Sequence, residues 1–296
     1  MSDGGAPDRT IGVVIRTLDE SELIGSCLES LQSQRGSFEL DVLVVDSGST
    51  DATVEIARSH GARIVELSPG DFDYSKSLNL GIEEVRGELV ISLSAHAIPV
   101  EDGWLELMTA PFEDERVAGV STRQVPWPDA PWQEVKRLTH AFGEAPRTFS
   151  PGQADGLLFS NAASAIRRSV WEVHPFTLSA VEDLDWGQRV VAAGWSIVYE
   201  PRSAVYHSHR EGPRAQARRM IDINRVNDAR RTPLRTLREA GGYLRRDARS
   251  IFTLDDPLRR KLAYLAELVG TVWFYVIDFS RGGTTAERRR QDSGLG

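Results

Sequence analysis

Short apolar runs alternate with helix-like segments between Ile11 and Thr122, and this alternation constrains the fold more than any other feature of the chain. The apolar runs read IGVVIR, DVLVVD, ARIVEL, ELVISL and VAGVST. The segments that separate them, residues 20–34, 51–59, 75–86 and 102–112, have the patterning or the length of helices. Strand-length runs separated by helices of this size predict βαβ units, and therefore an α/β domain with a mostly parallel sheet flanked by helices.

The alternation stops between Pro126 and Gly156, where proline, tryptophan and charged residues predominate. We expect an irregular excursion over the working edge of the sheet there, because long irregular stretches in compact domains are usually functional loops. Order returns with FSNAASAIRRSVW, an acidic helix over residues 181–193, and the strand-like runs WSIVYEP and SAVYHSH. After Glu211 the pattern is helical.

These patterns predict three parts of the chain. Residues 1–10 form a polar, disordered leader, residues 11–210 form the α/β domain, and residues 211–296 form a helical C-terminal extension. A length of 296 residues, 41% of them hydrophobic, suits one large domain with a smaller appendage.

Composition narrows the classes of protein to consider. A single cysteine, Cys27, allows neither a disulfide framework nor a multi-cysteine metal site, and it favours a cytoplasmic protein. No N-terminal segment has the pattern of a signal peptide, so we expect no secretion by that route. The net charge of -8 argues against a nucleic-acid partner.

The predicted C-terminal extension has two notable stretches. Arginines outnumber acids between Arg210 and Arg260, which is typical of contact with phosphate or an anionic membrane surface and equally of a solvated helix face. The run LAYLAELVGTVWFYVIDF contains Glu267 and Asp278, and a charge in the middle of a bilayer is costly. We therefore expect a core or membrane-surface helix rather than a membrane span.

Polar residues follow the first two predicted strands. Neither turn contains the G-x-G-x-x-G pattern that cradles a pyrophosphate, which disfavours a nicotinamide or flavin enzyme. Asp46 ends the second strand, and Ser49 and Asp51 open the helix that follows. Asp46 can accept hydrogen bonds from a ribose hydroxyl or a base N–H there, or the three residues can simply cap the helix.

Ser94 and His96 end the fourth predicted strand, at the edge of an open α/β sheet where ligands bind. His207 and His209 lie two residues apart and face the same side of an extended segment. Imidazole is a common metal ligand, although each histidine taken singly more often has a packing or hydrogen-bonding role.

A cluster of acids marks the start of the predicted helix near residue 181. Glu182, Asp183 and Asp185 lie in the run VEDLDWGQRV. The helix dipole favours acids at such a position for purely structural reasons, so the cluster by itself leaves a catalytic and a structural role open.

Taken in order, VVIRTLDE, VVDSGSTDAT, FDYSKSLNLGIEEVRGELVISLSAHAIP, FSNAASAIRRSVW, EDLDWGQRVVAAGWSIVYEP and VYHSH resemble glycosyltransferase family 2, in particular its rhamnosyltransferase-like members from cell-surface polysaccharide pathways. The resemblance covers about Ile11 to Arg210. It implies a GT-A fold and the transfer of a sugar from a nucleoside-diphosphate sugar to an acceptor hydroxyl with inversion. Rhamnose is the leading candidate for that sugar.

The resemblance also implies roles for individual residues. Asp183 matches the general base, with Glu182 beside it as a second catalytic residue. Asn161 is expected under the acceptor or the donor sugar, and Trp186 is expected at the acceptor. Trp186, Trp127 and Trp132 could each stack on a sugar ring or be an ordinary core residue. The residues expected to bind the nucleotide sugar are Arg16, Thr17, Glu20, Asp46, Ser49, Lys76, Asn79 and Ser94.

The expected metal site departs from the family pattern. The fourth strand of the family normally ends in an Asp-x-Asp motif that binds Mg²⁺ or Mn²⁺, and this chain has Ser94 and His96 at those positions. We expect His96 to replace an aspartate as ligand, with His207 or His209 as the late histidine, and the preference to shift from Mg²⁺ toward Mn²⁺. Metal-independent catalysis, with arginines or a neutral His96 on the diphosphate, stays open.

Two other functions stay open at this point. One is a metal-dependent hydrolase that uses His96, His207, His209 and Asp183 around one ion, and the other is a degenerate transferase subunit without activity. For a transferase we expect a saccharide or lipid-linked saccharide acceptor and no nucleic acid. We also expect a cytoplasmic location, with peripheral contact to the inner face of the plasma membrane through the basic C-terminal part, and a homodimer is an alternative use of that part.

Overall fold

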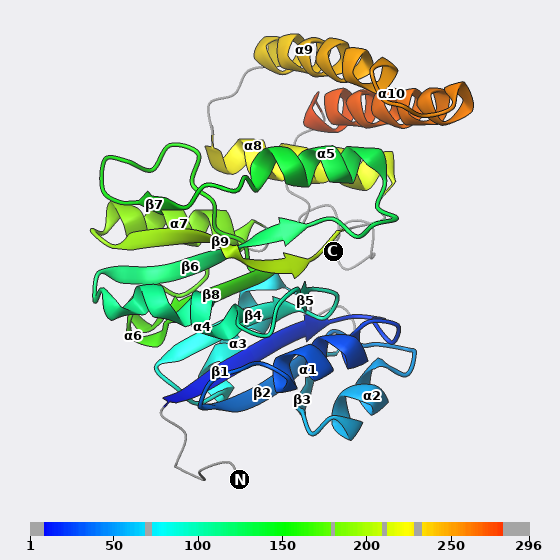
Figure 1. Cartoon of the computed structure of the whole chain (residues 1–296). Helices are drawn as coiled ribbons and strands as arrows, with labels where there is room; N and C mark the ends of the chain where they lie inside the picture. The colour runs from blue at the N-terminus through cyan, green and yellow to red at the C-terminus, as the bar shows by residue number, and fades with distance from the viewer. Residues whose placement is uncertain (1–8, 69–72, 179–180, 209–211, 228–232, 281–296) are drawn as a thin grey trace. The chain divides into compact units, whose positions relative to one another are not determined.

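The computed structural model describes residues 9–68, 73–178, 181–208, 212–227 and 233–280 (Figure 1). The chain folds into two compact units. The first contains Met1–Pro128 and Leu138–Ser208, and the second contains Asp129–Arg137 and His209–Gly296.

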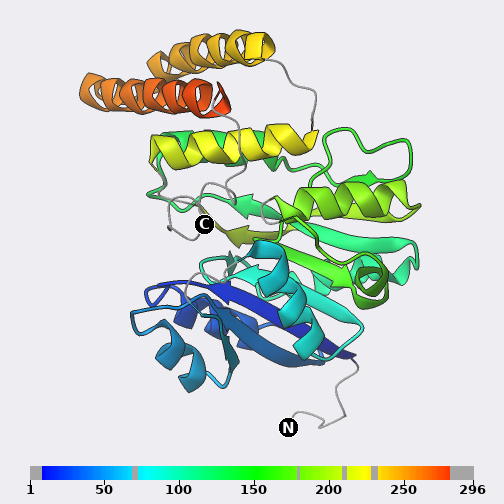
Figure 2. The same ribbon diagram turned by 180° about the vertical axis from the view of Figure 1, so that it is seen from behind.

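A nine-stranded mixed sheet forms the centre of the first unit (Figures 1 and 2). Eight strands follow the order β3-β2-β1-β4-β8-β6-β9-β5, and β7 pairs with β9. Strand β1 is parallel to β2 and to β4, and β2 is parallel to β3. Strand β8 is antiparallel to both β4 and β6. The strands are β1 (Arg9–Thr17), β2 (Phe38–Asp46), β3 (Arg63–Glu66), β4 (Leu89–Ser94), β5 (Ile98–Pro99), β6 (Val117–Val125), β7 (Arg147–Phe149), β8 (Ala163–Arg167) and β9 (Ser196–Tyr206).

Helices cover both faces of this sheet (Figures 1 and 2). Side chains along a strand alternate between faces, so Val13 and Val14 of β1 enter different cores. One core joins the sheet to α1 (Ile24–Gln32), α2 (Thr53–Ser59) and α4 (Trp104–Thr109), and α4 continues into the short 3-10 helix η1 (Ala110–Glu113). The other joins it to α3 (Tyr74–Glu84), α6 (Arg168–Val173) and α7 (Glu182–Ala192).

The register brings several strand ends to one edge. Thr17 of β1 pairs with Asp46 of β2, and Arg16 pairs with Ser94 of β4. Because β8 runs the other way, its first residue, Ala163, pairs with Leu93 at the same edge. The sheet therefore gathers the chain segments after β1, β2 and β4 and before β8 at its carboxyl edge.

The predicted α/β fold with a mostly parallel sheet is confirmed, but two local predictions are wrong. The expected irregular excursion contains α5 (Trp132–Ala141) and β7, since three of its prolines precede the helix and Pro146 and Pro151 follow it, so that none interrupts it. The runs WSIVYEP and SAVYHSH are predicted as two strands, but Ser196–Tyr206, which covers most of both, is one strand, β9. Pro201 is accommodated because β9 has an irregularity against β6 between Glu200 and Ala204, where no ladder N–H is required.

The second unit is helical. It contains the first residues of α5 together with α8 (Pro213–Asn227), α9 (Pro233–Phe252) and α10 (Leu258–Ser280). Small and aromatic side chains, among them Ala217, Ala240 and Tyr275, form its core. Residues Leu258–Phe279 of α10 are long and apolar enough to cross a membrane. Of the apolar 18-residue stretch within them, 22% is buried in the structure.

Candidate active site

Two adjacent carboxylates begin α7 at the carboxyl edge of the sheet. Glu182 and Asp183 are the first residues of this helix. The preceding residue, Val181, has φ +58°, a left-handed backbone conformation that is unfavourable for a β-branched side chain. Local strain of this kind is maintained only where the surrounding structure requires it, and it is common at functional sites.

Asn161 and Arg16 hold the two carboxylates. Glu182 is buried, and its Oε1 accepts hydrogen bonds from Arg16 Nη1 at 3.1 Å and Asn161 Nδ2 at 3.3 Å. The Asn161 backbone N–H donates to Asp183 Oδ2 at 3.1 Å, and the Leu184 N–H donates to Oδ1 at 2.8 Å. The Asp183 carboxylate is thereby fixed in position without a direct ion pair to any residue that the structure describes.

The environment of Asp183 changes its acidity. Burial, and then the neighbouring Glu182 carboxylate, raise the pKa of Asp183 to about 7. The hydrogen bonds from Leu184 and Asn161 and the charge of Arg16 oppose this shift. A carboxyl group whose pKa lies near neutrality can take up a proton under physiological conditions, as a general base must.

The loops after β1 and β2 hold each other through side chains. Asp46 is buried, and its Oδ2 accepts from the N–H groups of Gly48 at 3.0 Å and Ser49 at 2.9 Å. Ser49 Oγ accepts from the Asp19 N–H at 2.8 Å, and Asp19 Oδ1 accepts from the Thr50 N–H at 2.7 Å. Asp46 and Ser49 thus shape the turn. Sequence reasoning missed Asp19, whose left-handed φ of +52° has no clear sequence signal.

Two polar groups at the end of β1 have no hydrogen-bond partner among the described residues. These groups are Thr17 Oγ1 and Arg16 Nε, and both are buried. The Arg16 guanidinium also lies over the Tyr74 ring, 5.3 Å from its centroid. The predicted Arg16 and Thr17 therefore present unused hydrogen-bonding groups at this edge, and Tyr74 is an aromatic neighbour that sequence reasoning did not identify.

The two predicted residues of α3 differ in their surroundings. Lys76 is exposed, and its backbone N–H is capped by Asp73 Oδ1 at 3.0 Å. Asn79 Oδ1 accepts from Trp171 Nε1 at 2.9 Å and from the Phe176 N–H at 3.2 Å, and its Nδ2 donates to the Phe176 carbonyl at 2.9 Å. The Asn79 amide thus braces residues 171–176 against α3.

His96 lies in a small polar cluster beyond β4. Its Nδ1 lies 2.6 Å from Glu20 Oε1, and its ring stacks on that of His207 with centroids 4.9 Å apart and planes 13° apart. His207 is buried, and its Nδ1 lies 2.9 Å from Gln124 Oε1. Because a metal ion binds in the plane of an imidazole, one ion cannot lie in both of these stacked, nearly parallel planes.

The expected set of three histidines is therefore not assembled by the residues that the structure describes. His209 lies outside those residues. Within the described ranges, no group of three or more His, Cys, Asp or Glu side chains is arranged to hold a metal ion. Ser94, which the sequence also placed here, has its Oγ 3.3 Å from both ring nitrogens of His96.

The two predicted acceptor residues are buried, which corrects that expectation. Trp186 is 0% exposed, packs against Phe159 and Phe176, and donates its indole N–H to the His174 carbonyl at 2.7 Å. No face of this ring is open to a sugar. Asn161 is also 0% exposed, and it lies beneath the carboxylate pair rather than at a surface.

The other two tryptophans that sequence reasoning considered lie in different units. Trp127 stacks on Tyr206 in the first unit, with ring centroids 4.9 Å apart. Trp132 stacks on Tyr264 in the second unit, with centroids 5.9 Å apart. Each ring thus has an aromatic partner within its own unit.

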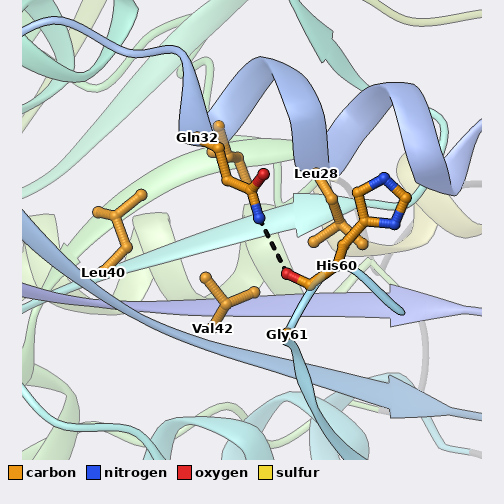
Figure 3. Close-up of a pocket in the computed structure, with 7 residues that line it drawn as sticks. Leu28, Gln32, Leu40, Val42, His60 and Gly61 are labelled. Atoms are coloured by element: carbon orange, nitrogen blue, oxygen red, sulfur yellow. Dashed lines mark hydrogen bonds between the residues drawn. The ribbon is translucent and has the colours of Figure 1, made fainter. Parts of the chain in front are cut away.

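A cavity of about 160 Å³ lies between α1 and β2, away from this edge (Figure 3). Leu40 and Val42, from the first half of β2, form part of its lining, and the Gln32 side chain donates to the His60 carbonyl beside it at 2.9 Å. Val42 lies four positions and Leu40 six positions before Asp46 along an extended strand, so these two residues are roughly 13–20 Å from the carboxyl end of β2. The cavity belongs to the helix–sheet packing and not to the candidate active site.

The chain matches a known protein family and is similar to several known proteins. A family model described as Glycosyl transferase family 2 matches residues 12–173. The O-antigen chain rhamnosyltransferase WbaN of Salmonella anatum is 30% identical over 190 residues, which are 61% of this chain and 60% of WbaN. RfbN of Salmonella typhimurium, also an O-antigen chain rhamnosyltransferase, is 27% identical over 224 residues, 72% of this chain and 70% of RfbN.

A solved structure agrees with the fold. The mannosyltransferase PcManGT from Pyrobaculum calidifontis, in complex with GDP-Man and Mn²⁺, superposes with a TM-score of 0.55 over 96% of this chain and 79% of its own, at 18% identity. At this identity the likeness concerns the fold alone. The region matched by WbaN spans less than two thirds of that protein's length.

Proposed function

This chain belongs to glycosyl transferase family 2, and from that premise we propose that it transfers a sugar from a nucleoside-diphosphate sugar to an acceptor hydroxyl, with inversion. Family membership identifies it as a glycosyltransferase, which leaves the hydrolase reading without support. Rhamnose is the proposed sugar, because two relatives are named rhamnosyltransferases. By the same likeness we propose a role in cell-surface polysaccharide synthesis, with a saccharide or lipid-linked saccharide as acceptor. We assign transfer to residues 11–210.

The observation that carries the proposal is the fixed, weakly acidic Asp183 at the carboxyl edge. Asp183 removes the proton of the acceptor hydroxyl while its oxygen attacks the anomeric carbon. The bond from that carbon to the diphosphate breaks on the opposite face, so the electron pair leaves with the nucleoside diphosphate. A positioned base contributes roughly 10²- to 10⁴-fold to the rate. Glu182, paired with Arg16, acts beside it by keeping the pKa of Asp183 high.

The nucleotide end of the donor is assigned to the loops after β1 and β2. We propose that Thr17 Oγ1 and Arg16 Nε, which lack partners among the described residues, bind donor atoms. Asp46 and Ser49 shape the turn that receives the nucleoside. Lys76, which is exposed, supplies a positive charge for the diphosphate. Asn79 supports α3 through its own hydrogen bonds and has a positioning role.

A divalent cation, Mn²⁺ or Mg²⁺, is proposed at Glu20 and His96. His96 Nδ1 and Glu20 Oε1 lie 2.6 Å apart, as in a hydrogen bond, and the two groups would separate slightly to hold an ion. Two protein ligands suffice for such an ion, because substrate phosphates and water commonly supply the others. His207 does not join them as a ligand while its ring is stacked on His96. When bound, such a cation would neutralise charge that develops on the diphosphate.

Binding measurements test the donor side. Calorimetric titration of the full chain with a panel of nucleoside diphosphates and their sugars, each with Mn²⁺, Mg²⁺ or chelator, should show metal-dependent binding of one nucleotide. Binding that is unchanged by chelator would remove the cation and leave Arg16 and Lys76 to hold the diphosphate. The absence of binding to any nucleotide would contradict the transferase and favour a degenerate subunit.

Substitution tests the base. Asp183→Asn should lower turnover by roughly 10²- to 10⁴-fold, while donor affinity changes only a few-fold. Asp185→Asn is a matched control, because Asp185 lies in the same helix turn but pairs with Arg189 at 2.8 Å. Turnover near the wild-type value in Asp183→Asn would remove Asp183 as the base.

A further inference from the structure

The surface of α10 has two opposite faces. Buried side chains recur along one face and pack within the helical unit, among them Leu268, Thr271 and Tyr275. Exposed apolar side chains recur along the other face at spacings of three or four residues, which places them in one row. This row, called the apolar stripe below, consists of Leu258, Leu262, Ala266, Val269 and Trp273.

The apolar stripe is strongly exposed among the described residues. Leu258 is 64% exposed, Leu262 52%, Val269 49% and Trp273 63%. Burying a large apolar side chain stabilises a protein or a complex by about 1.5–3 kcal/mol. A row of four such residues therefore represents a substantial binding energy that the unit itself does not use.

Exposed basic side chains are frequent on α9 and at the start of α10. Eight basic and four acidic residues lie between Arg235 and Lys261, and α9 and α10 pack against each other (Figure 1). Arg238, Arg245 and Arg249 are exposed on α9, and none of them pairs with an acid among the described residues. Arg259 is exposed at the start of the stripe itself.

We propose that the apolar stripe and the arginines of α9 dock on the surface of an anionic lipid bilayer. Apolar side chains enter the boundary between headgroups and acyl chains, and arginines meet the lipid phosphates. Tryptophan is favoured at this depth because its ring is apolar while its N–H can still reach water or a headgroup.

A second copy of the chain is a weaker occupant. The stripe runs from Leu258 to Trp273, about 22 Å at the rise of an α-helix, and a helix is about 10 Å wide. Such a surface buries about 200 Å² on each copy, whereas a stable interface buries about 800 Å² on each partner. Two copies would also bring their arginine-rich α9 helices together, which is unfavourable.

The opposite face of α10 argues against a membrane span. Asp278 is buried, with Arg214 Nε at 3.8 Å and Arg218 Nε at 3.9 Å from its Oδ2. Thr271 Oγ1 donates to Gln216 Oε1 at 3.2 Å. These polar contacts join α10 to α8 within the unit, and insertion across a bilayer would have to break them or take α8 along.

Vesicle flotation with the purified full chain tests the proposal. We expect binding to vesicles of phosphatidylcholine and phosphatidylglycerol at low salt, and binding weaker by about tenfold or more to phosphatidylcholine alone or at high salt. The double variants Leu262→Ser/Trp273→Ser and Arg245→Glu/Arg249→Glu should each lose about tenfold or more in affinity for the mixed vesicles. Far-UV circular dichroism of each variant verifies the fold.

Matched controls come from the first unit. Val173→Ser changes an apolar side chain that is 72% exposed, and Arg9→Glu reverses an exposed arginine. Both should leave vesicle binding unchanged. Equal losses in the controls and the double variants would contradict the proposal, because binding would then follow from overall charge or hydrophobicity.

Other outcomes of these measurements would assign the apolar stripe to a different occupant. Failure to bind mixed vesicles at low salt overturns the proposal, and a concentration-dependent doubling of mass that Trp273→Ser abolishes would assign the stripe to a second copy. Retention on vesicles after an alkaline carbonate wash would indicate a span. No donor or acceptor is present in these measurements, so their result is independent of the proposed transferase activity.

Discussion

Two aspartates of the first unit, the buried Asp41 and the partly buried Asp183, have opposite environments. Asp41 of β2 accepts hydrogen bonds from the Arg63 guanidinium at 3.1 Å and from the Arg86 N–H at 2.7 Å. Burial by itself would raise the pKa of Asp41, but these two partners outweigh it and the pKa is lowered. Asp183 has a like charge beside it, and its pKa is raised. The contrast distinguishes a carboxylate that stabilises the fold from one that is suited to proton transfer.

The largest effect expected from this contrast is on the pH dependence of turnover. Asp183 must be deprotonated to act as base, so kcat/KM should fall about tenfold for each pH unit below the apparent pKa near 7. Initial rates between about pH 5 and 8 give this profile, and Asp185→Asn should preserve it. A flat profile over this range would assign proton removal to another group.

An intermediate effect is expected on stability at Asp41. Asp41→Asn should lower the free energy of unfolding by about 1–3 kcal/mol at neutral pH, with the smaller figure favoured because Arg63 and Arg86 are 48% and 68% exposed. The folded pKa of Asp41 lies below the unfolded value, so its stabilisation is present above 3.8 and is lost as the pH falls through the folded pKa.

Urea denaturation at neutral and acidic pH measures this loss. The difference between wild type and Asp41→Asn should shrink in acid, and turnover per folded molecule should be unchanged. Asp102→Asn is the control, since Asp102 is 52% exposed in its pair with Arg35 and contributes little. A loss of turnover in folded Asp41→Asn would contradict the distinction between Asp41 as a structural carboxylate and Asp183 as the proposed base.

Asp183 should also affect stability, with a pH dependence opposite to that of Asp41. Its unfolded value is 3.8 and its folded pKa is about 7, so the folded state holds more protons between these values. Stability from this group is therefore full below 3.8 and is lost as the pH rises toward 7, by about 1 kcal/mol for each pH unit. Unfolding free energies of wild type and Asp183→Asn should converge or cross over this range, and parallel curves would contradict the raised pKa.

The local sequence pattern predicted the strands and helices of the first unit. The features that it did not predict depend on contacts between residues far apart in the chain. The strands and helices up to Val125 follow from the periodicity of their own residues. Acids at the start of a helix are visible in the sequence, and the resemblance to glycosyltransferase family 2 points to Glu182 and Asp183 among them. The burial of Trp186 and the support that Asn161 gives to Asp183 could not be predicted, because both depend on residues distant in the chain.

The strained turn at Val181 has a practical consequence for engineering. A glycine at this position would relieve about 1–2 kcal/mol of backbone strain and should increase the stability of the protein. It would also loosen the turn that aims Glu182 and Asp183. A selection for heat resistance and a selection for turnover would thus favour different residues at position 181.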